Sequence, residues 1–520
     1  MIIPGFKGGL ANSLFDPVEI QTYQDSSDLD VFSSSNILTP IYKIGSDTMN
    51  GGGTALSTTK VQAAIKASNG SYYLIGNSGT SDQRRLFSAS SLGSDSTLGT
   101  EGTSATASTA PSLNNLRAML ELDGSIFFHN SSTILSRYVI ATDTYTEVWQ
   151  TPTGGGLTDA FLAHGGLKLA FFAGGNIIHK WDGTTFTDSA LTLSANWTVE
   201  SMCEYGRFVL IGARDDSQAK NSQIFVWDGS ATTVDDIISV GDTGLQVIRN
   251  VNGEVHILTV QQEAGFTQNF CRIYTWSGGQ VLLRHELDLG PTTNSTPARI
   301  RDSAVDVYND ALYFGFDAKT SGVMGMANGV YIYGKDKITG RRVLTLGKLT
   351  ATAQHGTPDS SNISITGLRQ TGKITLVFWT DGTTYYVNHQ IASTRRSIDG
   401  VYESNAFLIG KGGPRKIKRI TINHKPLPTD CGFTVQVKHY GHYPKGTSVP
   451  SEDSYADLTT NEGSGSSTGK TQSTTNTTYT EIDQPNVFKE ARYAQIKIKF
   501  DEISTNTAAS IIFPILIETE

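Results

Sequence analysis

The sequence predicts an all-β protein: a seven-bladed β-propeller followed by a C-terminal antiparallel β-sandwich, with an extended N-terminal arm. Three observations predict this fold: a tryptophan-containing turn that recurs, a hairpin pattern that is repeated seven times, and a composition suited to strands and turns. The 520 residues include 53 glycines, and long runs of the helix formers Ala, Leu, Glu and Lys are missing. The expected boundaries are 1–54 for the arm, 55–412 for the propeller and 413–520 for the sandwich.

The recurring turn reads Trp-Asp-Gly twice and Trp-Ser-Gly once, with its tryptophans 46 and 49 residues apart. Asp or Ser can bond the local backbone, Gly supplies a positive φ, and Trp ends a strand where it packs between neighbouring sheets. The same turn at this spacing indicates one structural unit that is repeated. The predicted blade-turn residues are Trp181, Asp182, Gly183, Trp227, Asp228, Gly229, Trp276 and Gly278.

A longer unit surrounds this turn and occurs seven times. In each copy two apolar runs flank a tight turn of the Asn-Gly or Asp-Gly kind, which favours a β-hairpin because both central residues need positive φ. A four-stranded unit of this size buries its faces only by stacking against its neighbours, so seven of them predict a propeller. Two unrelated β-sandwiches with similar hairpins are the alternative. The turn residues are Gly70, Gly124, Gly166, Gly206, Gly253, Asp310 and Gly372.

The N-terminal arm, residues 1–54, has no blade pattern, but it contains the short apolar stretch ILTPIYKI. Pro40 cannot donate a hydrogen bond to a strand ladder, so this strand belongs at an edge or an end. We expect it to complete the last blade and close the ring, although closure by internal hairpins remains open. Because the arm is poor in core residues of its own, we expect a neighbouring subunit to order it.

After residue 412 the pattern changes to alternating apolar and polar residues in at least five segments, among them RKIKRITINH, FTVQVKHY and YAQIKIKF. Such segments over about 110 residues predict a separate antiparallel sandwich. The stretch 459–478 between them is almost entirely Thr, Ser, Gly and Asn, which is typical of a long surface loop.

The charge balance and the cysteines exclude several classes of protein. The net charge of −8 gives a surface that repels duplex nucleic acid, so no sequence-specific nucleic-acid binding is expected. Three widely spaced cysteines without a CxxC pair indicate neither a disulfide framework nor a zinc site. No signal peptide and no apolar run of about 18 residues is evident, so the sequence predicts a product of a reducing cytoplasm without membrane insertion.

Motifs for cofactors and metals fail on spacing. The stretch GSGSSTGKT at 463–471 imitates a phosphate-binding loop, but its first glycine falls at the wrong distance from Gly469. His439 and His442 lack a third ligand, and the acidic stretch DSSDLD with Asp25, Asp28 and Asp30 lacks the glycine and glutamate of a calcium loop. We therefore expect no cofactor, no metal and no catalytic residue.

One basic stretch stands out at the start of the C-terminal domain. It runs GKGGPRKIKRITINHK without an acidic residue. Two interpretations stay open: the solvated face of an edge strand, where lysine also blocks aggregation, or a contact with a neighbouring subunit. The residues of the second interpretation are Lys411, Arg415, Lys416, Lys418 and Arg419.

The order of these parts resembles a virion protein of tailed bacteriophages. The opening GGLANSLFDPVEI, the strand ILTPIYKI ahead of the first blade, and the closing pattern from KIKRITINHKPLPTDCGFTVQVKHYG to IIFPILIETE carry the resemblance. It is similar to the propeller-bearing nozzle proteins of short-tailed phages, although nozzles insert their outer domains between blades. The resemblance implies a homo-oligomeric ring in the phage tail, made in the host cytoplasm, which forms a DNA conduit or a fibre platform and contacts adaptor and fibre proteins.

Two other functions remain as alternatives. A receptor- or glycan-binding protein at the tail tip or on a fibre would use exposed aromatic residues, such as Tyr385 and Tyr386 or the three turn tryptophans. A polysaccharide-cleaving propeller enzyme would need paired carboxylates or an arginine cluster that converge at one mouth of the channel, which sequence cannot show. The sequence contains no HExxH motif, so we expect that the protein is not an enzyme.

Overall fold

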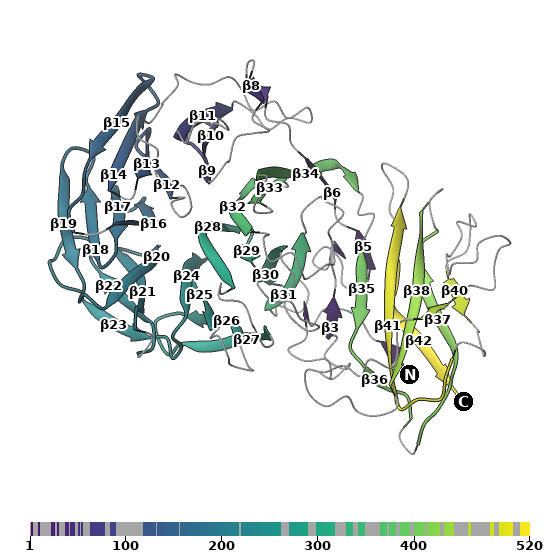
Figure 1. The fold of residues 1–520 in the computed structure, drawn as a ribbon. Coiled ribbons are helices and arrows are strands. Elements are labelled where there is room, and N and C mark those ends of the chain that lie inside the picture. The colour runs from purple at the N-terminus through teal and green to yellow at the C-terminus, as the bar shows by residue number, and fades with distance from the viewer. Residues whose placement is uncertain are drawn as a thin grey trace. The chain divides into compact units, whose positions relative to one another are not determined.

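The computed structural model is built from β-strands throughout the part of the chain that it describes (Figure 1). No helix in that part is long and apolar enough to cross a membrane. The described residues are 2–3, 9–10, 22–25, 29–30, 37–40, 42–46, 50–51, 54–55, 63–77, 84–89, 118–131, 133–154, 156–217, 220–261, 270–289, 298–317, 329–335, 342–348, 364–371, 374–380, 385–395, 400–410, 413–426, 431–440, 456–458, 479–482, 488–502 and 510–520.

The chain divides into two compact units. One unit, called unit 1 here, consists of Met1–Gly45, Gly329–Gly356 and Gln390–Glu520. The other, unit 2, consists of Ser46–Asn328 and Thr357–His389.

Unit 2 begins with five antiparallel sheets in chain order, each a meander in which a strand pairs with the next one along the chain. Their strands are β9 (Ala63–Lys66), β10 (Tyr72–Asn77) and β11 (Arg84–Ala89); β12 (Met119–Leu122), β13 (Ser125–Ser131), β14 (Ile134–Val139) and β15 (Thr144–Gln150); β16 (Leu157–His164), β17 (Leu169–Gly174), β18 (Ile177–Trp181) and β19 (Phe186–Thr192); β20 (Trp197–Tyr205), β21 (Phe208–Asp215), β22 (Gln223–Trp227) and β23 (Asp236–Ser239); and β24 (Leu245–Val251), β25 (Glu254–Gln261), β26 (Phe270–Trp276) and β27 (Leu282–Asp288).

Unit 2 also contains the antiparallel pair β28-β29 and the antiparallel run β32-β33-β34. Their strands are β28 (Arg299–Tyr308), β29 (Ala311–Asp317), β32 (Ser364–Thr371), β33 (Ile374–Thr380) and β34 (Tyr385–Arg395). The antiparallel pair β30 (Gly329–Lys335) and β31 (Arg342–Lys348) belongs to unit 1, as does β6 (Tyr42–Ser46) up to Gly45. A separate short pair is formed by β7 (Asn50–Gly51) and β8 (Thr54–Ala55).

The first strand of each sheet in unit 2 packs against the first strand of the next sheet. The contacts run in one order and end where they began: β9, β12, β16, β20, β24, β28, β32 and again β9. The sheets therefore succeed one another like the blades of a propeller, with their first strands innermost.

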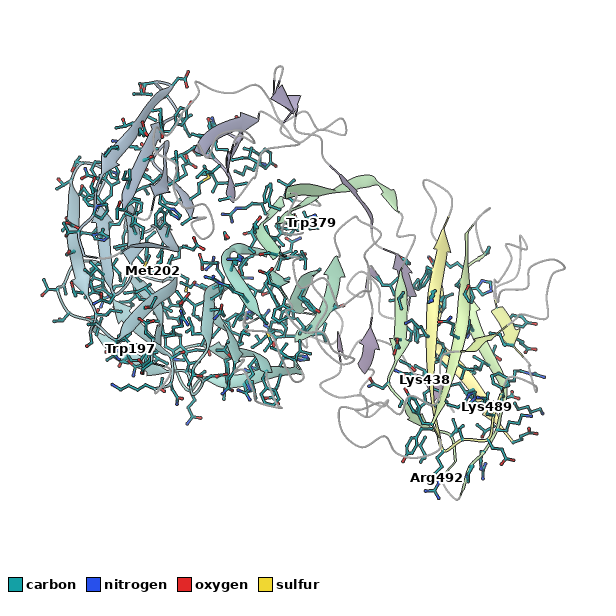
Figure 2. All side chains as sticks on the ribbon, in the orientation of Figure 1. Trp197, Met202, Trp379, Lys438, Lys489 and Arg492 are labelled. Atoms are coloured by element: carbon teal, nitrogen blue, oxygen red, sulfur yellow. The ribbon has the colours of Figure 1, made fainter. Side chains whose placement is uncertain are left out.

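Apolar side chains fill the space between consecutive sheets. Trp197 and Met202 of β20, which Figure 2 labels, share one buried cluster with Phe171 of β17 and Trp227 of β22. The ring centroids of Phe171 and Trp227 lie 5.4 Å apart in an edge-to-face arrangement, which adds to the gain from burying both rings. Similar clusters join the first sheet to the second, the second to the third and the fourth to the fifth. Each sheet is thus stabilised by its neighbours.

The tryptophan-containing turns have the geometry that their residues favour. Gly183, Gly229 and Gly278 have φ of 93°, 79° and 94°. In the first turn Asp182 Oδ1 accepts hydrogen bonds from the backbone N–H groups of Thr184 and Thr185, at 2.9 and 2.6 Å. The three tryptophans are the last residues of β18, β22 and β26, so the turn sits after the third strand of its sheet.

One hairpin turn differs from the sequence-based prediction. Gly70, Gly124, Gly206, Gly253 and Asp310 have positive φ, but Gly166 does not. In that hairpin the turn extends over residues 165–168, and Lys168 takes the left-handed conformation at a φ of 55°. The longer turn moves the strained position two residues along the chain. Gly372 lies outside the described residues.

Unit 1 contains two further sheets built from both ends of the chain. One has the order β4-β5-β42-β37-β40 with β1 also on β42, and the other has the order β2-β3-β35-β41-β38-β39 with β36 also on β41. The strands are β1 (Ile2–Ile3), β2 (Gly9–Leu10), β3 (Thr22–Asp25), β4 (Leu29–Asp30), β5 (Ile37–Pro40), β35 (Val401–Ser404), β36 (Phe407–Leu408), β37 (Ile417–His424), β38 (Cys431–Tyr440), β39 (Ala456–Leu458), β40 (Tyr479–Ile482), β41 (Tyr493–Glu502) and β42 (Ile511–Thr519).

The described strands of the N-terminal arm pair within their own chain, and the ordering of the arm by a neighbouring subunit stays a prediction. Strand β1 pairs with β42, with Ile2 opposite Leu516, and β5 pairs with the same strand. Strand β3 pairs with β35. The backbone groups of these short strands therefore find their hydrogen-bond partners inside unit 1, and the buried side chains of Ile3 and Leu38 add to its core.

We predict that Gly229→Val lowers the free energy of unfolding by about 1–3 kcal/mol. Gly229 has a φ of 79°, and a Cβ atom there would approach Leu167 Cδ1 and Phe171 Cζ to 3.2 Å. The measurement is thermal or denaturant unfolding of the variant beside Gly279→Val, because Gly279 has no heavy atom near its own Cβ position and no positive φ. Equal stability of the two variants would contradict the assigned turn.

We also predict a pH-dependent contribution from His285 on β27. Burial lowers the pKa of its imidazole to about 4, so the folded state binds a proton less readily than the unfolded state, whose pKa is about 6.5. The contribution to stability is present at neutral pH and is lost as the pH falls, by about 1–2 kcal/mol between pH 7 and pH 5. Denaturant unfolding of His285→Gln should show a flatter decline over this range than the unmodified protein, whereas Arg284→Gln should not.

Candidate functional site

The innermost strands of unit 2 enclose a polar cavity of about 230 Å³. Strands β16, β20, β24 and β28 supply its walls. Each of them contributes at least one charged or amide side chain. The polar side chains are Asp159, Thr198, Glu200, Gln246, Arg299 and Asp302. The sequence could not show that three carboxylates converge here.

A smaller cavity of about 70 Å³ shares two of these residues, Asp159 and Asp302. Strands β9, β12 and β32 also contribute to its wall, so the two cavities together are bordered by all seven innermost strands. Arg249 and Arg369 bring two guanidinium groups to this smaller space. The site is therefore a mixed cluster of acids and arginines.

Asp302 and Arg249 form the central ion pair. Arg249 Nη1 donates to Asp302 Oδ1 at 2.7 Å and its Nη2 donates to the Asp302 backbone carbonyl at 2.9 Å. The Ser201 hydroxyl donates to the same carboxylate oxygen at 2.5 Å. Burial lowers the pKa of Arg249, but the attraction of Asp302 outweighs that effect, and the pKa is raised overall. The pair, together with Ser201, connects β20, β24 and β28.

Glu200 is another carboxyl of the larger cavity. Burial raises the pKa of its carboxyl above the ordinary value, against the opposing attraction of Arg214 and Arg299. The Nε of Arg214 donates to Glu200 Oε1. The carboxylate is thus held between a guanidinium on β21 and the cavity.

Hydrogen bonds of polar side chains also connect β28 and β29 to β32, and β32 to β9. Asp317 at the end of β29 accepts a hydrogen bond from the Ser364 hydroxyl at 2.8 Å, and the Ser303 hydroxyl on β28 donates to the Thr366 carbonyl at 2.8 Å. Arg369 on β32 donates through Nε to the Ala64 carbonyl on β9. Hydrogen bonds between polar side chains and backbone therefore bridge the point where the circuit of strands closes.

The turn tryptophans lie away from this cavity and are mostly covered. Trp181 is 7% exposed and Trp227 is fully buried, with its indole N–H donating to the Ala231 carbonyl at 2.7 Å. Trp276 is partly exposed, and its ring lies 5.1 Å from that of Tyr205. Two of the three tryptophans have no face available for stacking on a sugar. The side chains of Tyr385 and Tyr386 lie outside the described residues.

The basic stretch is not on an edge strand, which corrects that interpretation. Strand β37 lies between β42 and β40, because its central residues pair with both. Lys418 is exposed, and Arg419 lies 3.6 Å from Glu481 of β40. Because β37 has partners on both sides, Lys418 does not protect a free edge.

Other basic side chains lie in the same unit. Arg415 is exposed and is held by a backbone bridge to Ala491, next to the exposed Arg492. Figure 2 labels Arg492 together with Lys438 and Lys489 in this C-terminal part. Lys416 is half-buried, and Lys411 lies outside the described residues. The prediction of a subunit contact at this stretch remains a prediction.

Most residues of the other candidate motifs lie outside the described part of the chain. His439 is buried on β38, whereas His442, Asp28 and the stretch 463–471 lie outside the described residues. No group of three His, Cys, Asp or Glu side chains in the described part of the chain is placed to hold a metal ion. Cys203 and Cys271 are buried free thiols, and burial raises the pKa of each to about 12.

The comparisons with known proteins concern the fold. No family model and no curated protein matches the chain. Solved structures similar to it include the extracellular domain of the putative hybrid two component system BT4673 from B. thetaiotaomicron, at 12% identity and a TM-score of 0.41 over 72% of this chain and 43% of that chain. The chain thus spans under half the length of that relative.

Two other similar structures are the Neurospora crassa Pan2 WD40 domain and the N-terminal domain of Nup159. The first has 9% identity and a TM-score of 0.40 over 64% of this chain and 89% of that one. The second has 9% identity and a TM-score of 0.39 over 71% and 100%. None of the three is described as a phage tail protein. The fold shown is all-β, with successive four-stranded antiparallel sheets that resemble propeller blades.

We predict that Asp302→Ala lowers the free energy of unfolding by about 2–4 kcal/mol. The substitution leaves the buried Arg249 guanidinium and the Ser201 hydroxyl without their shared acceptor. Denaturant unfolding measures the loss, and Asp235→Ala, which removes an exposed carboxylate from the same unit, is the matched control. A loss no larger than that of the control would show that the pair does not hold the innermost strands.

Proposed function

We propose that this chain is a structural virion protein of a tailed bacteriophage, part of the tail, in which a seven-bladed β-propeller and a β-sandwich form a rigid building block. The observation that carries the proposal is the circuit of innermost strands in unit 2, which returns to its first strand after seven sheets. A closed and densely packed body of this kind suits a part that must keep its shape while a genome leaves the particle.

Two aromatic contacts support the sandwich in unit 1. The ring centroids of Tyr402 on β35 and Phe513 on β42 lie 5.3 Å apart, and those of His424 on β37 and Phe433 on β38 lie 5.5 Å apart. Each contact joins one sheet to the other. Alternate residues of β42 and β37 are buried, as expected for strands with one face on a shared core.

The polar axis of unit 2 bears on the role of a conduit. Its cavities of about 230 and 70 Å³ are crossed by ion pairs, so the axis of one propeller offers room for small molecules only. A passage for DNA would therefore be formed by several copies in a ring, with Arg415 and Lys418 among the exposed groups available for contacts with an acidic neighbour. The overall negative charge would keep passing DNA from adhering.

The test is to locate the chain in a particle. We expect antibodies raised against the purified chain to label the tail of the phage whose genome encodes it. Averaged electron micrographs of that tail should show a ring of subunits, each with seven blades. Preimmune serum is the control. Labelling of the capsid alone, of fibres alone, or of no particle would overturn the proposed position.

A receptor-binding protein is the second candidate, and one observation favours it. Leu282 and Leu283 on β27 are 44% and 49% exposed, and their register partners Thr275 and Tyr274 lead to the partly exposed Trp276. Exposed apolar residues gathered at one sheet end are typical of a binding surface. Adsorption of the purified chain to host cells, lost in Leu283→Asp but kept in Val148→Asp, would support this function, whereas absence of adsorption would support the scaffold.

A further inference from the structure

The larger cavity of unit 2 is lined by three carboxylates, two of which have arginine partners. Asp302 accepts a hydrogen bond from Arg249 at 2.7 Å, and Glu200 accepts one from Arg214. Burying a carboxylate is costly unless cations or hydrogen bonds compensate. The two arginines supply both kinds of compensation, so their acids do not require a ligand.

The third carboxylate, Asp159, also interacts with the protein around it. His129 Nε2 lies 3.7 Å from Asp159 Oδ1. Burial lowers the pKa of the Arg301 guanidinium on β28, and the negative charges of Asp317 and Asp159 act against that effect. The acids of the lining therefore have their partners within the protein, and they give no reason to expect a cationic ligand.

Two other side chains of the lining carry N–H groups for which the described residues supply no acceptor. They are Arg299 on β28 and Gln246 on β24. Neither side chain forms a hydrogen bond or an ion pair within the described part of the chain, and Arg299 acts on Glu200 through its charge alone. A guanidinium and a carboxamide both donate through planar N–H groups. The unmatched groups of this cavity are therefore mainly donors, which favours a ligand that accepts hydrogen bonds.

The charges around these donors favour an anion with a single negative charge. A guanidinium can donate two parallel hydrogen bonds to a carboxylate, which makes such a contact specific as well as strong. Because Glu200 and Asp302 are paired with arginines, their repulsion of one negative charge is reduced, whereas a dianion is repelled more strongly. A single carboxylate therefore fits this space better than sulfate or a phosphate dianion.

The size of the cavity and its apolar wall restrict the rest of the ligand. About 230 Å³ corresponds to roughly eight waters at their share of liquid volume, about 30 Å³ each. This is below the about 300–1,000 Å³ of pockets for drug-sized ligands, so the occupant is a small molecule. Leu157 and Ile300 are buried and add aliphatic surface to the lining. A carboxylate with a few carbon atoms meets both conditions.

We propose that the axial cavity binds a short aliphatic monocarboxylate, with its carboxylate at Arg299 and Gln246 and its carbon atoms against Leu157 and Ile300. The guanidinium supplies the charge and two of the hydrogen bonds, and the carboxamide adds a further donor. The cavity lies within one chain, so this site does not depend on the role of the chain in a virion.

Isothermal titration and thermal unfolding of the full chain at constant ionic strength provide the test, with acetate, propionate and L-lactate as probes. Acetamide has the shape of acetate without its charge, methylammonium has the opposite charge, and sulfate is a dianion. We expect at least one monocarboxylate to bind at one site per chain and to raise Tm, with each comparison compound at least about tenfold weaker. Equal or tighter binding of any comparison compound would overturn the assignment, and so would the absence of binding by every monocarboxylate.

Two variants locate the site. Arg299→Gln should weaken binding of the carboxylate at least about tenfold, and Gln246→Leu should weaken it less, because each removes donors that border the cavity. Arg284→Gln removes the same group from Arg284, which is 45% exposed, and should leave the affinity unchanged. Unchanged affinity in either cavity variant would contradict the site. If a variant does not fold, the pattern of probes on the unmodified chain decides, because it rests on no substitution.

Discussion

The structure of unit 2 depends on one constraint: a sheet of four strands has two apolar faces, and only neighbouring sheets can cover both. Clusters such as the one that joins Phe171, Trp197, Met202 and Trp227 meet this requirement between consecutive sheets. Since each sheet covers its neighbours, the arrangement needs the last sheet to meet the first, which the contact between β32 and β9 provides. Removing one sheet would expose an apolar face on each of its two neighbours, so the stability of each sheet depends on the others.

The same constraint explains the chemistry of the axis. Where the first strands of the sheets converge, their polar side chains line shared cavities. Charges there must be paired across strands, and Arg249 with Asp302 and Arg369 with the Ala64 carbonyl are pairings of this kind. Pairing gives little net stability over apolar packing, but it fixes which strand lies beside which. The polar side chains of the first strands therefore determine the order of the strands, and the apolar clusters between the sheets stabilise that arrangement.

The features that could be predicted from sequence are local. Asp182 accepts a hydrogen bond from Thr184, and Gly183 takes a positive φ. Both features lie within the turn, so the turn follows from the tripeptide alone. The shift of strain from Gly166 to Lys168 depends on turn length, which the Gly-Gly dipeptide does not determine. The internal position of β37 and the convergence of Asp159, Glu200 and Asp302 depend on pairings tens to hundreds of residues apart, and no periodicity reports them. The only hint was charged residues, such as those in RIRDSAVDV, within otherwise apolar first strands.

Unit 1 shows what long-range pairing implies for the whole chain. Its strand β42 pairs with β1 and β5 as well as with β37, so residues from both termini share one sheet. Such contacts close loops of several hundred residues, and the entropy of closure must be compensated by contacts that form late. The sheets of unit 2, made of hairpins, can form while the chain is still incomplete, whereas the two sheets of unit 1 require the C-terminal strands. The order of strands along the chain therefore makes the meander of unit 2 the part that can form first and unit 1 the part that completes the fold.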